Sequence, residues 1–340
     1  MRGLLASFLL LAAALLAGPA RAAAPADEGA LQRGVEAAAA GRYEEALRIF
    51  DGVARASPDR PEGPFFRAAV YQLLKGHFEL PEYKQGLLDN AARVLALTEE
   101  SGRRQPLDAE AQLLAGLTRG MLAVEALNDS RFIEAFLEGR RMVALLERAL
   151  ALDPALADAQ YGLGVYRVRR AQLFWLRPFL GHEREEGVRM LRRAAEGGRW
   201  MGTLARVDLA WALYREERYD EARRELAPLI ARYPDQPLYR AARAEGFFLQ
   251  RDYPRAREEF AALRRGLAER EDAFSRLYAR FAQWRVARCD YALGRYAEAQ
   301  RAAREVAEAP DLSSSLLRQV RRGAAEMLER LGSPASAARP

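Results

Sequence analysis

The sequence predicts an all-α protein built as a solenoid of antiparallel helix pairs. Half of the 340 residues are apolar, and the strong helix formers alanine, leucine, arginine and glutamate outnumber the β-branched residues. A short motif also returns along the chain with a spacing that is typical of repeat proteins. Repeat arrays bury their apolar surface between neighbouring units, so a chain of this length does not need one large core.

The repeated motif is a tyrosine followed three residues later by an alanine, inside a charged amphipathic helix. It occurs in four segments: Gly41–Ala46, Arg218–Ala222, Asp252–Ala256 and Gly294–Ala299. Tyr219 and Tyr253 are 34 residues apart, whereas Tyr253 and Tyr296 are 43 apart. The second spacing predicts an extension of nine residues that lengthens the connection around Glu269 to Ser275.

Small residues predict close packing within each helix pair. One lies midway along each first helix, at Gly34, Ala210, Ala244 and Ala287. The motif supplies the facing alanine of each second helix, at Ala46, Ala222, Ala256 and Ala299. Four residues later comes a residue that fills the space between successive pairs: Phe50, Leu226, Phe260 or the smaller Ala303. Because proline cannot donate the next helical hydrogen bond, we expect Pro58, Pro234 and Pro310 to end second helices.

These positions resemble the tetratricopeptide repeat (TPR) family over residues 31–58 and 143–310. Another unit follows the same pattern, with 145–154 ending a second helix, 159–166 in a first helix, and Arg184–Ala195 as the next second helix. The resemblance implies a right-handed superhelix of antiparallel helix pairs that serves as a protein-binding scaffold. Residues 108–260 also resemble long TPR-like proteins of the Iml2 type, through Gly162–Tyr166, the insert 171–182 and Arg184–Gly187. That second resemblance implies architecture and gives no partner.

The chain is expected to divide into four segments. Residues 1–22 form a secretory signal peptide, 23–142 hold N-terminal TPR-like helical repeats, 143–331 hold C-terminal TPR repeats, and 332–340 form a flexible tail. The C-terminal set contains the insert 171–182 and ends in a capping helix over Leu316–Leu331. In the N-terminal set the pattern predicts helices at Pro64–Lys75, Tyr83–Glu99 and Asp108–Ala126, with a longer connection at Gly76–Pro81.

The first 22 residues have the three parts of a secretory signal. Arg2 supplies the positive end, Leu4–Ala17 the apolar run, and Ala20–Ala22 a cleavage site. The run is shorter than the roughly 20 residues that span a bilayer, although an uncleaved anchor is the alternative. We therefore expect a periplasmic or secreted protein without a transmembrane segment in the mature chain. Cys289 is the only cysteine, so an internal disulfide is excluded and a buried, inert thiol is expected.

The sequence offers no catalytic, metal or cofactor site. His77 and His182 are the only histidines, and His182–Glu186 is missing the second histidine of a zinc-protease motif. There is no GxSxG segment, and Gly162–Gly164 does not continue into a dinucleotide-binding fingerprint because position 167 is arginine. The formal net charge of +6 is spread thinly, without the basic runs of nucleic-acid-binding proteins. We predict a protein that is not an enzyme, has no cofactor and does not bind nucleic acid.

Partner binding is expected on the concave face that the family resemblance implies. Counting from the packing positions along the first helices places ten residues there: Tyr161, Arg169, Trp211, Tyr214, Arg215, Glu245, Phe248, Trp284, Arg288 and Tyr291. Aromatic and arginine side chains anchor protein interfaces, because they give large contact area or forked hydrogen bonds. The alternative is that most of these aromatics pack between repeats. The lysine, asparagine and arginine set with which some TPR domains hold chaperone tails is missing.

The apolar insert Phe174–Gly181 is the second candidate site, with Phe174, Trp175 and Phe179 as its docking residues. It either docks a partner, touches a lipid surface, or folds back into the superhelix. The leading hypothesis is a non-catalytic interaction scaffold of the bacterial cell envelope that binds a protein or peptide of unknown identity. The alternative is a membrane-surface or lipid-associated accessory protein that uses residues 174–180. A regulatory subunit of an envelope enzyme is not separable from the first hypothesis by sequence.

Overall fold

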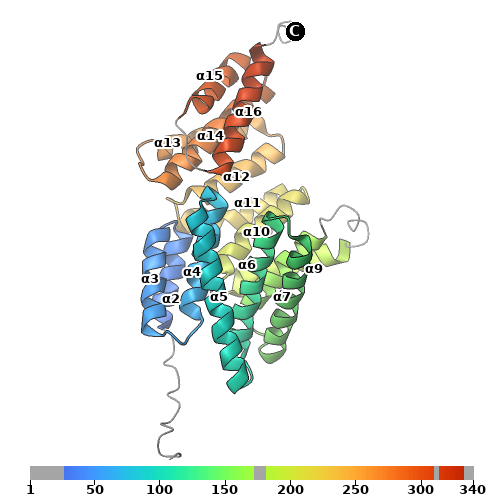
Figure 1. Cartoon of the computed structure of the whole chain (residues 1–340). Helices are drawn as coiled ribbons and strands as arrows, with labels where there is room; N and C mark the ends of the chain where they lie inside the picture. Colours follow the sequence, from blue (N-terminus) through green and yellow to red (C-terminus); the bar gives the residue numbers. More distant parts are fainter. Residues whose placement is uncertain (1–26, 172–180, 310–313, 333–340) are drawn as a thin grey trace, which may run out of the picture.

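A computed structural model of the protein describes residues 27–171, 181–309 and 314–332. These residues form fifteen α-helices (Figure 1). Their bounds are α2 Glu28–Ala39, α3 Tyr43–Ala56, α4 Glu62–Phe78, α5 Pro81–Arg104, α6 Ala109–Asn128, α7 Phe132–Leu152, α8 Ala157–Arg170, α9 Gly181–Gly197, α10 Gly202–Arg215, α11 Tyr219–Arg232, α12 Pro237–Leu249, α13 Tyr253–Leu267, α14 Ala273–Ala292, α15 Tyr296–Ala307 and α16 Ser315–Gly332.

The helices form seven antiparallel pairs, from α2/α3 to α14/α15, and α16 packs on the last pair. The even-numbered helices of neighbouring pairs also touch each other, as α6 touches α8 and α12 touches α14. The predicted fold class, an all-α TPR-type solenoid, is confirmed. The boundary predicted between residues 142 and 143 falls inside α7, so the helical array continues through it. The predicted leader, insert and tail lie largely or wholly outside the described residues.

The small and large motif positions pack as the sequence predicts. The four motif alanines, together with Ala210, Ala244 and Ala287, are buried. The same holds for Phe50, Leu226, Phe260 and Ala303, which lie between successive pairs. Gly34 has to be glycine, because a Cβ there would overlap the Phe50 ring. In the pair α8/α9, Gly164 and Gly187 face each other, and a Cβ on Gly187 would lie 3.0 Å from the Gly164 carbonyl oxygen.

Each described turn that connects the two helices of a pair contains one residue with positive φ. These residues are Gly41, Glu79, Ser130, Glu217, Arg251 and Gly294, with φ between 52° and 81°. A single left-handed residue reverses the chain tightly after the first helix, and glycine adopts this conformation without steric cost. Glycine at Gly41 and Gly294 therefore avoids steric strain, whereas in the other four turns a residue with a side chain adopts the less favourable left-handed conformation.

Two predicted connections differ from the structure. Gly76, His77 and Phe78 belong to α4, so the connection expected at Gly76–Pro81 is only Glu79 and Leu80. The extension expected around Glu269–Ser275 mostly lengthens a helix, because α14 has 20 residues and α12 has 13. Both differences have one cause: polar and glycine residues favour a loop, but packing against neighbouring pairs keeps the backbone helical. Pro58 and Pro234 follow helix ends as predicted, and Pro310 lies outside the described residues.

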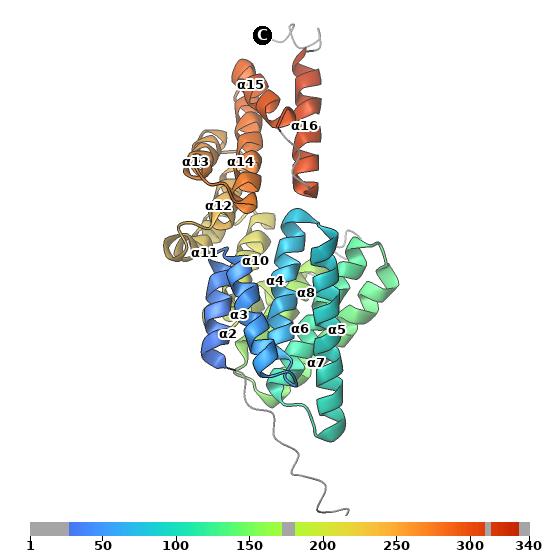
Figure 2. The same cartoon turned by 60° about the vertical axis from the view of Figure 1, so that its left-hand side comes forward.

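The array curls until its first helices touch its later ones (Figures 1 and 2). The Tyr239 hydroxyl on α12 donates to the Ala39 carbonyl at 2.7 Å, and Tyr233 donates to the Glu36 carboxylate at 2.9 Å. His77 on α4 lies among aromatic rings that include Tyr43 and Phe274, the latter at a centroid distance of 4.9 Å. The first pair therefore fills part of the space that an open superhelix would leave free.

The turn between α9 and α10 anchors a second internal contact. Trp200 in this turn packs edge-on against Phe66 of α4, with ring centroids 5.3 Å apart. Asp158, at the start of α8, accepts hydrogen bonds from the backbone N–H groups of Arg199, Trp200 and Met201 at 2.8–3.2 Å. A single carboxylate thus fixes the spacing of α8 and α10, on which the candidate site lies.

Candidate binding surface

Two pockets on the even-numbered helices gather most of the predicted partner-binding residues. The first, called the α8–α10 pocket, has a volume of about 340 Å³. The second, called the α12–α16 pocket, has a volume of about 330 Å³. Among the residues lining the α8–α10 pocket are Val165, Arg169, Val207, Asp208, Trp211 and Arg215. Among those lining the α12–α16 pocket are Phe248, Tyr253, Trp284, Arg288, Tyr291 and Arg330.

The α8–α10 pocket places two guanidinium groups beside one carboxylate. Asp208 accepts a hydrogen bond of 2.9 Å from the Tyr161 hydroxyl. Burial raises the pKa of Asp208, and burial together with the Asp208 charge raises the pKa of Tyr161 well above its usual value. Burial and the neighbouring Arg169 lower the pKa of Arg215, which nonetheless stays cationic at neutral pH. The pocket therefore carries an excess of positive charge next to the Trp211 ring.

The α12–α16 pocket combines aromatic rings with cations. The Arg288 guanidinium lies over the Phe248 ring, 4.7 Å from its centroid, and Arg285 lies over the same ring at 4.8 Å. Trp284 packs against α16 at Gly323, where a Cβ would lie 2.7 Å from the indole. Burial lowers the pKa of Arg288, with the charge of Arg285 acting in the same direction. This pocket is thus an aromatic hollow with an exposed arginine at its wall.

Three of the ten predicted partner-binding residues are buried or partly buried. Tyr214 and Glu245 are buried, so the prediction that they contact a partner is not supported by their positions. Glu245 forms an ion pair with Arg285, and the Tyr214 ring fills the space next to Gly246 of α12. Tyr161 is partly buried and is held by Asp208. These side chains join neighbouring repeats, which is the alternative that the sequence left open for aromatic residues.

The pockets also contain residues that the sequence prediction missed. Asp208 is three residues before Trp211, so helical periodicity alone could have placed it on the same face. Tyr253 belongs to the repeat motif, from which the sequence indicates the period of the array but no place in a binding pocket. Met327 and Arg330 come from α16, which has no repeat motif from which to count positions. The insert residues Phe174, Trp175 and Phe179 lie outside the described residues.

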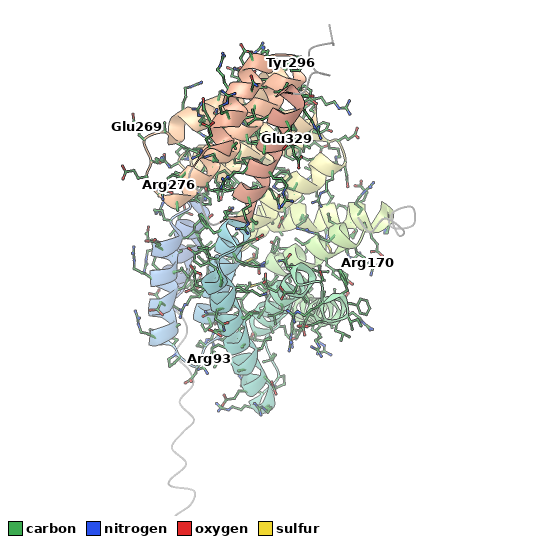
Figure 3. All side chains as sticks on the ribbon, turned by 45° about the horizontal axis from the view of Figure 1, so that its top comes forward. Arg93, Arg170, Glu269, Arg276, Tyr296 and Glu329 are labelled. Atoms are coloured by element: carbon green, nitrogen blue, oxygen red, sulfur yellow. The ribbon has the colours of Figure 1, made fainter. Side chains whose placement is uncertain are left out.

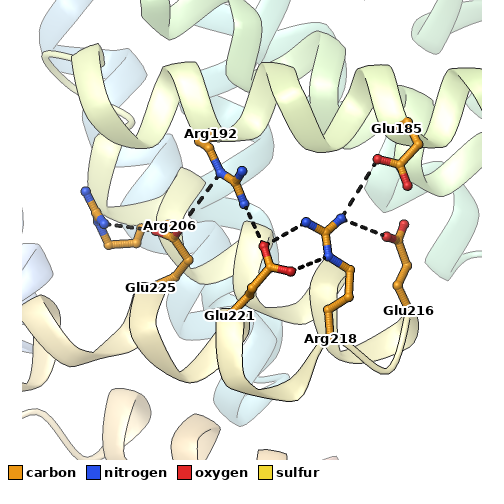
Figure 4. Close-up of polar contacts among 7 residues, drawn as sticks. All are labelled: Glu185, Arg192, Arg206, Glu216, Arg218, Glu221 and Glu225. Atoms are coloured by element: carbon orange, nitrogen blue, oxygen red, sulfur yellow. Dashed lines mark hydrogen bonds and ion pairs between the residues drawn. The ribbon is translucent and has the colours of Figure 1, made fainter.

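Most other charged side chains serve the array itself. Acidic and basic groups are interspersed over the surface, as Figure 3 shows for Arg93, Arg276 and Glu329 among others. Across α9, α10 and α11, ion pairs join four arginines and four glutamates in one network, and Figure 4 shows seven of its members. The members are Arg184, Glu185, Arg192, Arg206, Glu216, Arg218, Glu221 and Glu225. The hydrogen bond from Arg218 lowers the pKa of Glu221 to about 2, so this carboxylate is an ion-pair partner and unsuited to proton transfer at neutral pH.

Two negative findings apply to the described part of the chain. Within residues 27–171, 181–309 and 314–332, no three histidine, cysteine, aspartate or glutamate side chains are grouped so that they could hold a metal ion. Among the helices of the same ranges, none has both the length and the apolar character that crossing a bilayer requires. Cys289 is buried, as the sequence predicts, and burial raises the pKa of its thiol to about 12.

Comparison with known proteins adds the family. Residues 186–246 match the family model described as tetratricopeptide repeat, and no curated protein sequence matches the chain. A thermophilic TPR protein from Thermus thermophilus is similar in structure, with a TM-score of 0.44 and 21% identity over 66% of this chain and 100% of that chain. A TPR protein from Parabacteroides merdae has a TM-score of 0.43 and 12% identity over 90% and 98% of the two chains.

The human IFIT1 dimer with PPP-AAAA has a TM-score of 0.46 and 16% identity over 88% of this chain and 70% of that chain. These structural likenesses are distant, and the Iml2-type resemblance of residues 108–260 stays a prediction. The family match lies in the repeats α9 to α12, whose motif positions recur in the other pairs. The match thus shows a tetratricopeptide repeat segment at residues 186–246, within an array of seven stacked helix pairs.

Proposed function

We propose that this protein is a non-catalytic scaffold that binds a protein or peptide partner through the α8–α10 and α12–α16 pockets. The observation that carries the proposal is the grouping of seven predicted residues in two pockets on the inner helices. These are Arg169, Trp211 and Arg215 in one pocket and Phe248, Trp284, Arg288 and Tyr291 in the other. TPR arrays generally bind their partners on this surface. A role in the cell envelope rests on the predicted leader, residues 1–22.

The chemistry of the pockets favours a segment that carries both acidic and apolar side chains. Each pocket offers at least one exposed arginine beside an aromatic ring, at Arg215 with Trp211 and at Arg288 with Phe248. A forked guanidinium binds a carboxylate in two hydrogen bonds, while the ring contributes apolar contact area. Each pocket is near the lower end of the range for small-molecule sites, roughly 300–1,000 Å³, which suits a few side chains of an extended peptide.

Affinity capture from envelope extracts tests the proposal. We expect Arg215→Glu and Arg288→Glu each to reduce the recovered partner at least tenfold, because each reverses a charge within its pocket. Arg148→Glu is the matched control, since Arg148 is an exposed arginine on the outer helix α7. A partner recovered equally with all three variants would place the binding surface elsewhere.

The alternative, a lipid-associated accessory protein using residues 174–180, is tested separately. Liposome co-sedimentation of the wild type and Trp175→Ala would show lipid binding that depends on the insert. A chain that stays in the supernatant with every liposome composition would exclude this role.

A further inference from the structure

The end of α6 and the start of α7 expose a group of large apolar side chains, called here the α6–α7 patch. Six of the ten large apolar residues exposed in the described part of the chain belong to it. Their exposed fractions are Val124 41%, Leu127 53%, Phe132 68%, Ile133 79%, Phe136 59% and Leu137 46%. The concentration on one helix hairpin distinguishes the patch from the scattered apolar residues that any protein surface carries.

The patch exists because this hairpin is longer than the α8/α9 pair that follows it, whereas the α4/α5 pair before it is equally long. Helices α6 and α7 have 20 and 21 residues, whereas α8 has 14. Gly139 of α7 faces Tyr166 of α8, so antiparallel packing brings the last residues of α8 level with Ala135. The first turn of α7 therefore reaches the end of α8 or passes it. Phe132 occupies the motif position of Tyr43, which is buried, yet Phe132 is two-thirds exposed.

The exposed area is large enough to matter. Apolar side chains of this size carry on the order of 150–250 Å² each, so the six together expose roughly 600 Å². That is at the upper end of the largest apolar patch on a typical monomer, about 300–600 Å². Two such patches facing each other bury roughly 1,200 Å², which reaches the lower limit of a standard specific interface.

We infer that the α6–α7 patch pairs with the same patch on a second copy of this chain. In a dimer with two-fold symmetry the same patch of both copies forms the interface, so an apolar patch on one helix face can be covered without a different protein. On α7, Phe132, Ile133, Phe136 and Leu137 form two adjacent rows at spacings of four residues, which suits the packing of α7 against α7. The inference is independent of the proposed partner and of both pockets.

The charges around the patch fit an antiparallel arrangement. Glu134 lies in the first turn of α7, and the exposed Arg140 lies six residues further along without an ion-pair partner in the described residues. With two α7 helices antiparallel and crossing near Phe136 and Leu137, the Arg140 of one copy comes beside the Glu134 of the other. The charges at the edge are mixed, with Asp129 and Glu134 beside Arg131, which disfavours an anionic lipid surface as the occupant.

Sedimentation velocity of the purified chain over a range of concentrations tests the inference. The wild type forms a dimer, and Ile133→Glu or Phe136→Glu raises the dissociation constant on the order of a hundredfold, because each places two charges in the apolar interface. Both residues are mostly exposed, so the melting temperature stays unchanged when it is compared at a concentration where the wild type is monomeric. Leu152→Glu is the matched control, since Leu152 is 58% exposed at the other end of α7 and leaves the dimer intact.

Charge-reversal variants and cysteine variants test the geometry. Arg140→Glu weakens the dimer, and combining it with Glu134→Arg restores it. Because Cys289 is buried, a new cysteine is the only reactive thiol, and Phe136→Cys forms a disulfide-linked dimer under oxidation whereas Leu152→Cys does not.

Three results would overturn the inference. A wild type that is monomeric at every concentration is the first. The second is a monomer that binds phosphatidylcholine or phosphatidylglycerol vesicles and loses that binding in Ile133→Glu, which would assign the patch to lipid. The third is a monomer that begins to dimerise through Phe136 when Trp175 and Phe179 are replaced by serine, which would assign the patch to the chain's own insert.

Discussion

Asp158 connects the start of α8 to the turn before α10, and its replacement should separate two repeats. The carboxylate is buried and accepts hydrogen bonds from three successive backbone N–H groups, Arg199 to Met201. Gly198 leaves it room, because a Cβ at that position would lie 2.7 Å from the Asp158 Oδ1 atom. The N-terminus of α10 follows directly, so the negative charge also interacts favourably with the helix dipole.

The magnitude follows from the contacts. Asp158→Ala leaves three N–H groups without their acceptor, and each buried unsatisfied donor costs about 1–3 kcal/mol. We expect a loss of roughly 3–5 kcal/mol in the free energy of unfolding, reduced where water reaches the turn. Asp158→Asn keeps one oxygen, which serves Trp200 and Met201, but turns an amide N–H₂ group toward the Arg199 donor. It should therefore cost about 1–2 kcal/mol.

Urea unfolding and amide hydrogen exchange measure the effect together. Unfolding gives the free-energy change, and exchange at residues 199–204 shows whether the α9–α10 turn opens before the rest of the array. The control is Asp153→Ala, because Asp153 is an exposed aspartate that accepts one local hydrogen bond, from Ala155. If Asp158→Ala loses less than about 1 kcal/mol and the turn keeps its exchange protection, the carboxylate does not hold these repeats as argued.

Three other perturbations test separate features. Burial lowers the pKa of His77 to about 4 in the folded chain, while the unfolded value is about 6.5. The unfolded chain therefore binds a proton at a higher pH than the folded chain, so the free energy of unfolding falls by at most ~3 kcal/mol between pH 6.5 and pH 4. In His77→Phe the free energy of unfolding should change less over this pH range. A slope equal to that of the wild type would refute the role of His77. Burial raises the pKa of Cys289 to about 12, so alkylation of the native thiol should be roughly a thousandfold slower than in urea; comparable rates would contradict the burial. Gly187→Leu should lower the free energy of unfolding by about 3 kcal/mol, because the side chain forces α8 and α9 apart. Gly52→Ala should raise it by about 0.5–1 kcal/mol in thermal unfolding, because a Cβ at Gly52 meets only open space. Equal effects of the two variants would show that the glycine contact between α8 and α9 is unimportant.

The helix pairs could be predicted from the sequence because their determinants are local or recur at a fixed spacing. A tyrosine, an alanine and a later packing residue mark four of the seven second helices, and each pair contacts mainly its neighbours in sequence. The predictions failed where that regularity is broken. Gly76 to Phe78 read as a loop, yet His77 packs among rings from α3 and α14 that keep this turn of α4 in place. The missing information was the identity of a neighbour about 200 residues away.

The predicted partner-binding residues likewise divide into those whose position follows from local periodicity and those whose burial depends on neighbouring repeats. Helical periodicity groups Trp211 with Arg215 and Trp284 with Arg288, and each couple lines one pocket, whereas their contact with a partner stays a prediction. Periodicity does not separate exposed from buried positions at the edge of a helix face, and Tyr214 and Glu245 are buried against the next repeat. Burial depends on the angle between successive pairs, which is set by contacts such as Gly246 beneath Tyr214.

The residue pattern predicts the class of the fold and the antiparallel pairing of the helices without any tertiary information. These features follow from periodicity and from residue sizes at positions that repeat. Long-range packing, seen in the structure, decides that the first pair closes against α12 and α14, that two pockets lie on the even-numbered helices, and that α6 and α7 extend beyond the α8/α9 pair. The physical reason is that curvature accumulates from small rotations between pairs. Those rotations arise from packing between residues far apart in the sequence, which no single repeat encodes.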